Sequence, residues 1–85
     1  MSKMSFEAAK AAVKADIERE MPDCSLHAVW INCKLGALAA IKTEADLATP
    51  EEIALGIGKM DQHLTVSKQI RALIDATACR NSSTE

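Results

Sequence analysis

The segment from Ser25 to Lys42 constrains the fold of this chain more than any other feature. Its sequence, SLHAVWINCKLGALAAIK, is apolar on two opposite sides when it is wound as a helix at about 100° per residue. One face holds Leu26, Val29, Trp30, Cys33, Ala37, Ala40 and Ile41. The opposite face holds Ala28, Ile31, Leu35, Leu38 and Ala39. Such a helix must be covered on both sides, so we expect it to be central in a bundle or to contribute one face to a homodimer.

Composition favours helices over sheets. Apolar residues make up 48% of the 85 residues, but Phe6 and Trp30 are the only aromatic residues, which leaves few side chains suited to cross-strand pairs. Alanine, leucine and isoleucine fill the apolar share and are compatible with helices. The sequence therefore predicts an all-α fold in one domain, residues 1–85, with an ordered core over about 5–79 and a polar tail over 80–85.

The N-terminal segment has the pattern of a helix with one buried stripe. Ser5 is a suitable N-cap, and apolar residues recur at spacings of seven and four along one side: Phe6, Val13, Ile17 and Met21. Pro22 stops the helix because it has no backbone N–H to donate. We expect helices over about 5–21 and 25–43.

A third helix has the clearest start in the chain. Thr49, Pro50 and Glu52 form a capping threonine, a proline at the first helical position and a glutamate at the third. After this start, one apolar stripe is followed by a second that is turned by roughly 100° or more: first Ile53, Ile57, Met60 and Leu64, then Val66, Ile70, Leu73 and Ile74. The sequence therefore predicts helices over about 49–64 and 66–79, with a kink or break near Gly58–Val66.

Residues 50–75 also have a local likeness to a DNA-binding motif. Ala54, Ile57, Gly58 and Leu64 supply the small residue, hydrophobes and turn glycine of a helix-turn-helix, and TVSKQIRALID resembles the second helix of bacterial helix-turn-helix regulators. The resemblance implies contacts to nucleic acid by Lys68, Gln69 and Arg71. The net charge of −2 and the long gap from Gly58 to Val66 count against it, because such domains usually carry a basic face and a short turn.

Cysteine and histidine residues do not form a recognisable metal or catalytic pattern. Cys24, His27 and Cys33, with His63 or Cys79 brought in by folding, present one close pair where structural zinc sites normally have two. Cys24 at a helix N-terminus, with His27 or His63 as base, lacks an orienting carboxylate or an oxyanion hole at a known spacing. We expect no metal, no cofactor and no enzymatic activity.

Cysteine usage favours a cytoplasmic protein. Three cysteines at irregular spacing are typical of reduced thiols and do not suggest a disulfide framework. No segment is long and apolar enough to span a membrane, and the N-terminus lacks the apolar core of a signal peptide.

The function that remains is the binding of another protein. We expect a noncatalytic adaptor, inhibitor or regulator that acts as a homodimer, with a DNA-binding regulator as the alternative. The predicted interface uses four residues of the second face of the Ser25–Lys42 helix, Ala28, Ile31, Leu35 and Leu38, together with Gly36 and Trp30.

Overall fold

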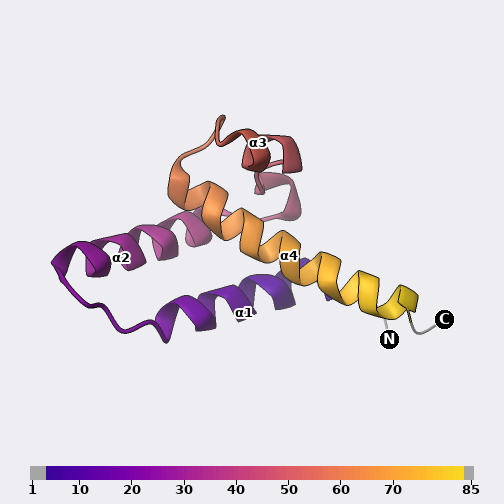
Figure 1. Ribbon diagram of the computed structural model, residues 1–85, viewed down its shortest axis with the longest axis horizontal. Coiled ribbons are helices and arrows are strands. Elements are labelled where there is room, and N and C mark those ends of the chain that lie inside the picture. Colours follow the sequence, from indigo (N-terminus) through magenta and orange to yellow (C-terminus); the bar gives the residue numbers. More distant parts are fainter. Residues whose placement is uncertain (1–3, 84–85) are drawn as a thin grey trace.

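A computed structural model describes the backbone of residues 4–83 and the side chains of residues 4–78 (Figure 1). The elements are α1 (Phe6–Glu18), α2 (Ser25–Ala40), the short 3-10 helix η1 (Glu44–Asp46), α3 (Pro50–Leu55) and α4 (Asp61–Ser83). The predicted all-α class is confirmed, and the described part of the chain is a small helical bundle without strands.

α1 begins as the sequence predicts and ends earlier. The Ser5 hydroxyl accepts a hydrogen bond from the Ala8 backbone N–H at 3.1 Å, which caps the helix. The helix ends at Glu18, three residues before Met21, and Met21 is exposed. Pro22 prevents a continuation of the helix through Met21, because the residue before a proline is pushed out of the helical region of backbone space.

α2 starts without a side-chain cap. Cys24 occupies the N-cap position and its side chain makes no capping hydrogen bond. Instead, the His27 Nδ1 atom accepts a hydrogen bond from the Asp23 backbone N–H at 3.1 Å. The imidazole thus satisfies a donor in the turn that joins α1 to α2.

The predicted start of α3 is confirmed. The Thr49 Oγ1 atom accepts from the Glu52 backbone N–H at 3.1 Å, and the Glu52 Oε1 atom accepts from the Thr49 backbone N–H at 2.9 Å. Its expected extent to residue 64 was wrong, because α3 ends at Leu55 where Gly56 adopts a left-handed conformation, φ 70°. Gly58 is also left-handed, φ 91°, which glycine adopts without strain.

The break therefore lies over residues 56–60, and α4 begins at Asp61. Gly58 lies inside the break as expected, while Val66 lies inside α4. α4 is also longer than the sequence suggests: the helix continues past residue 79 to Ser83, and residues 84–85 of the expected polar tail lie outside the described part.

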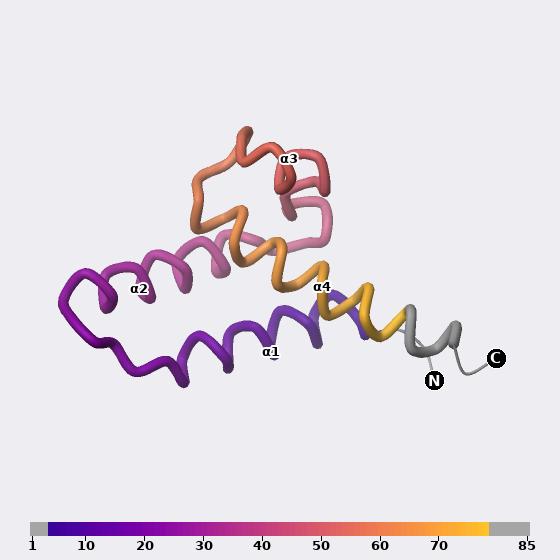
Figure 2. Tube along the Cα trace, viewed as in Figure 1, coloured from indigo at the N-terminus to yellow at the C-terminus, as the bar shows by residue number. Residues whose placement is uncertain are grey.

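The helices are arranged around α4 (Figure 2). α1 and α2 lie side by side in an antiparallel hairpin, and α4 crosses both. The sequence predicts a central second helix. In the structure, α2 packs against α1 and α4, and α4 packs against α1, α2 and α3. Buried apolar residues come from α1, α2, the segment before α3, and α4: Ala9, Val13, Ile17, Ile31, Leu38, Ile41, Leu47, Ala48, Leu64, Val66 and Ile70.

Hydrogen bonds fasten the segment between α2 and α3 to α4. The buried Ser67 hydroxyl accepts from the Ala48 backbone N–H at 3.0 Å, and the Arg71 Nε atom donates to the Ala48 carbonyl at 2.6 Å. His63 Nε2 lies 2.9 Å from the Asp46 carbonyl. At the other end of α4, the Thr77 hydroxyl accepts from the Met4 backbone N–H at 2.8 Å.

Candidate protein interaction surface

The structure buries one apolar face of α2 and exposes the other. Ile31 and Leu38 are 9% and 1% exposed and lie in the core, and Leu35 packs against that core. Leu26 is 81% exposed and Val29 is 59% exposed. The exposed residues and their neighbours along the same side form what we term the α2 outer face: Leu26, Val29, Trp30, Cys33, Gly36, Ala37 and Ala40.

The residues of the predicted interface differ in burial. Ile31 and Leu38 are covered within the chain by the packing of α1 and α4 on α2, and Leu35 and Ala28 are partly covered. Trp30 and Gly36, which were predicted as interface residues too, are exposed on the outer face. For all of these residues the interface remains a prediction.

A cluster of charged side chains lies where α2 meets the end of α1. Lys34 is buried, and its Nζ atom donates to Glu20 Oε2 at 2.9 Å. His27 Nε2 lies 3.6 Å from Glu20 Oε1. The hydrogen bond from Lys34 holds the pKa of the Glu20 carboxyl below its ordinary value, and burial opposes this only in part. Because Lys34 and His27 both turn toward Glu20, the outer face of α2 carries no charged side chain.

Sequence reasoning missed this cluster, although a signal for it exists. Lys34 and His27 are seven residues apart, so they lie on one seam between the two apolar faces of the helix. They are the only two basic residues of α2. An acidic partner was available at the end of α1, in Glu20. Because that seam lies between the two apolar faces, pairing it with the carboxylate would have placed the end of α1 beside α2 without deciding which face is buried.

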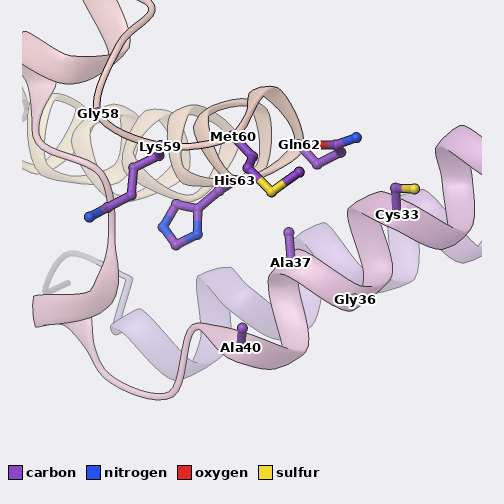
Figure 3. A pocket seen from close by; sticks show the side chains of 9 residues that line it. All are labelled: Cys33, Gly36, Ala37, Ala40, Gly58, Lys59, Met60, Gln62 and His63. Atoms are coloured by element: carbon purple, nitrogen blue, oxygen red, sulfur yellow. The ribbon is translucent and has the colours of Figure 1, made fainter.

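A groove runs between the C-terminal half of α2 and the start of α4 (Figure 3). It has a volume of about 730 Å³ and is lined by Cys33, Gly36, Ala37, Ala40, Gly58, Lys59, Met60, Gln62 and His63. The methyl groups of Ala37 and Ala40 point toward the side of the groove from which the Met60 and His63 side chains come, whereas Lys59 points away (Figure 3). The floor is therefore small and apolar, and Met60 supplies a flexible wall.

A second hollow of about 540 Å³ continues along the N-terminal half of α2. Its lining is Cys24, Leu26, His27, Val29, Trp30, Cys33 and Gln62. Cys33 and Gln62 line both hollows, so the two form one apolar surface along the outer face. The α3–α4 connection adds exposed apolar side chains in Leu55, Ile57 and Met60.

The two histidines considered for metal binding and catalysis have other partners, and the cysteines do not join them. Both ring nitrogens of His27 face other partners, Asp23 and Glu20, and His63 Nε2 faces the Asp46 carbonyl. Cys24 and Cys33 are exposed free thiols, and the side chain of Cys79 lies outside the described residues. Within the described range, no three histidine, cysteine or acidic side chains come together in a way that could hold a metal ion.

The predicted nucleic-acid contacts lie on α4 but do not act together. Lys68 and Gln69 are exposed. Arg71 is half-buried and donates to the Ala48 carbonyl, so its guanidinium holds the segment before α3 in place. The first turn of α4, where a reading helix meets base edges, begins with the acidic Asp61.

The class that fold and surface define is a small all-α bundle with one exposed apolar helix face. No protein-family model, no curated protein and no solved structure matches the chain. Among the described helices, none combines the length and the apolar character needed to cross a membrane.

Proposed function

We propose that this protein is a noncatalytic protein interaction module, an adaptor, inhibitor or regulator of another protein, and that it acts as a homodimer. The observation that carries the proposal is the α2 outer face, where Leu26, Val29 and Trp30 are exposed on a surface without charge. Contiguous apolar patches on small proteins commonly mark surfaces that another molecule covers.

Two parts of the surface support the proposal. The outer face of α2 presents a rigid helix, and Trp30 is of the residue type that most often dominates binding energy at interfaces. Leu55 at the end of α3, with Ile57 and Met60 on the loop before α4, forms the second apolar surface, and methionine adapts to partners of different shape. A module with two apolar surfaces can join one copy to another and still bind a different protein.

A cytoplasmic location is part of the proposal. Cys24 and Cys33 are exposed thiols, and a reducing compartment keeps such thiols free. We place no reaction on the chain, because the groups that would activate either thiol, His27 and His63, are already engaged with other partners.

Affinity capture from the native host, followed by mass spectrometry, tests this function. We would compare the parent protein with two double variants, Leu26→Ser with Val29→Ser and Leu55→Ser with Ile57→Ser, each altering one exposed apolar surface. The control is Ala11→Ser with Ala39→Ser, at exposed positions outside both surfaces. We expect one protein to be captured by the parent and the control and lost with at least one apolar variant. Equal capture by all four, or none, would contradict the proposal.

The alternative function is that of a DNA-binding regulator that uses residues 50–75. Lys68 and Gln69 are free to approach a phosphate backbone because both are exposed. This alternative expects salt-dependent binding to duplex DNA that weakens in Lys68→Ala with Gln69→Ala, two changes that leave the Arg71 hydrogen bond to Ala48 intact. Absence of binding to genomic DNA at low salt would eliminate it.

A further inference from the structure

On the α2 outer face, positions at equal distances before and after Cys33 hold side chains of opposite size. Positions 26 and 40 lie seven residues from Cys33, positions 29 and 37 lie four away, and positions 30 and 36 lie three away. On the N-terminal side these positions hold large residues, and on the C-terminal side they hold small ones: Leu26, Val29 and Trp30 against Ala40, Ala37 and Gly36. Spacings of three, four and seven keep all of them on one side of a helix.

We propose that the α2 outer face binds the α2 outer face of a second copy of this chain, with the two helices antiparallel and the two-fold axis at Cys33. In that arrangement Leu26 faces the other copy's Ala40, Val29 faces Ala37, and Trp30 faces Gly36. Every large residue meets a small one, so the helices interdigitate without voids. The inference rests on the proposed homodimer and names its geometry.

The groove provides the space that this geometry requires. Gly36, Ala37 and Ala40 form its floor, and Met60 and His63 stand beside them on the far side (Figure 3). Trp30 of the other copy would enter at Gly36 and lie along Met60, a thioether that packs well against aromatic rings. A parallel pair would instead set Trp30 against Trp30 and Gly36 against Gly36, which leaves the groove empty.

Charge also favours a second copy over a charged partner. None of the seven outer-face residues is ionic, since Lys34 and His27 turn to Glu20, and Lys59 in the groove lining points away from α2 (Figure 3). Two copies of this face bring together apolar surfaces without like charges, although each chain has a net charge of −2. The antiparallel order further places the positive N-terminal end of one α2 near the negative C-terminal end of the other.

The exposed surface of the chain is large enough for such an interface. A folded monomer of 9.1 kDa is expected to expose about 4,900 Å². This chain exposes 5769 Å² and has principal extents of 47 × 28 × 20 Å. A standard interface takes about 800 Å² from each partner, roughly one seventh of this surface.

Gly36 allows a variant that separates folding from association. A Cβ atom added at Gly36 meets nothing within 4 Å inside the chain, and Gly36 is not among the glycines with positive φ. Gly36→Leu is therefore compatible with the single chain but fills the place of the other copy's Trp30. The matched control is Ala39→Leu, which adds similar bulk at an exposed position of α2. This position lies roughly 120° around the helix from Cys33, the proposed axis.

Sedimentation equilibrium gives the dissociation constant, and the emission of Trp30, the only tryptophan, reports on the same face. We expect the parent and Ala39→Leu to dimerise, with a blue shift of emission as concentration rises. We expect Gly36→Leu to weaken dimerisation by more than about tenfold while its helical circular dichroism is unchanged. A monomeric parent at high micromolar concentration, or equal dimerisation by Gly36→Leu, would overturn the proposal.

Thiol cross-linking tests the direction of the helices. A variant that keeps Cys33 alone (Cys24→Ser with Cys79→Ser) is compared with one that keeps Cys24 alone (Cys33→Ser with Cys79→Ser). Diamide oxidises two thiols to a disulfide and is itself reduced to the hydrazine. In the antiparallel pair the two Cys33 residues meet at the axis, whereas the two Cys24 residues lie about 27 Å apart along the helices. We expect a covalent dimer from the first variant only.

Cross-linking through Cys24 as efficient as through Cys33 would show a parallel pair and overturn the antiparallel geometry. These outcomes are distinct from failure of the proposed function. A monomer that still captures a host protein through Leu26 and Val29 contradicts the geometry alone. A Cys33-linked dimer that captures no host protein keeps the geometry and removes the adaptor role.

Discussion

Two leucines of the same helix have opposite environments. Leu38 is 1% exposed and lies in the core, whereas Leu26 is 81% exposed on the α2 outer face. Both belong to apolar faces of similar length, so hydrophobicity alone does not decide which one the bundle buries. The packing of α1 and α4 on α2 covers the face that holds Leu38, and the pairing of Lys34 with Glu20 lies at the edge of that face. The sequence of an apolar helix face thus does not determine whether the face is buried within its own chain. The packing of the other helices determines it.

The largest effect is expected from truncating the buried leucine. Leu38→Ala should lower the free energy of unfolding by about 2–5 kcal/mol, because it removes apolar contacts and leaves a cavity. Leu26→Ala should change it by about 0.5 kcal/mol or less in the monomer, where that side chain contacts little. Urea unfolding followed by circular dichroism, at concentrations below the dimer midpoint, measures both. Equal losses would show that the two faces are not different in the folded chain.

The next effect concerns the lysine that faces the core side. Lys34→Ala should lower the free energy of unfolding by about 1–2 kcal/mol, because it deletes packed methylene groups and a hydrogen bond to a half-exposed carboxylate. Lys42→Ala is the matched control, since Lys42 is exposed beyond the end of α2. If both variants unfold at the same urea concentration, Lys34 does not anchor the buried face.

A gain of stability is expected on the outer face. Gly36→Ala should raise the free energy of unfolding of the monomer by about 0.5–1 kcal/mol, because alanine loses less backbone entropy than glycine in a helix. The added methyl group meets no atom within 4 Å in the chain. Thermal unfolding of the dilute protein checks the direction. A loss of stability there would mean that Gly36 is not in open space.

The smallest effect is a dependence on pH. The folded pKa of Glu20 is lowered, first by the Lys34 hydrogen bond, so its stabilising contribution is present above the unfolded pKa and is lost as pH falls below about 4.5. Asp46 and Glu52 have lowered pKa values as well, through backbone hydrogen bonds from Thr43 and Thr49. Glu20→Gln should flatten part of the acid slope, measured as urea midpoints between pH 6 and pH 3. An unchanged slope would contradict the role of Glu20.

The fold was predictable wherever local chemistry decides it. The capping residues Thr49 and Glu52 and the two glycines at 56 and 58 act on their own neighbours, so the start of α3 and the break after it follow from the sequence. The end of α3 was misplaced because the stripe from Ile53 to Leu64 continues in phase across the glycines, and periodicity alone does not register a break.

The interaction surface was harder to predict because it depends on long-range packing. Ile31 and Leu38 looked as available as Leu26 and Val29, and only the positions of α1 and α4 distinguish them. Arg71 resembled a nucleic-acid contact in sequence, but its partner, the Ala48 carbonyl, lies 23 residues away and has no local signature. A pattern of side chains in the sequence does not reveal that a backbone carbonyl will accept the hydrogen bond.

The hydrogen bond between the Met4 backbone and the Thr77 hydroxyl has a consequence for rearranging the chain. Residues 73 positions apart are neighbours at one end of α4, at the side where α1 starts. A short glycine linker between the two ends, with a new opening among residues 56–60, would give a circular permutant that keeps all four α-helices whole. In such a permutant α4 would precede α1, and the new termini would lie at the rim of the groove, because Gly58 and Met60 line it.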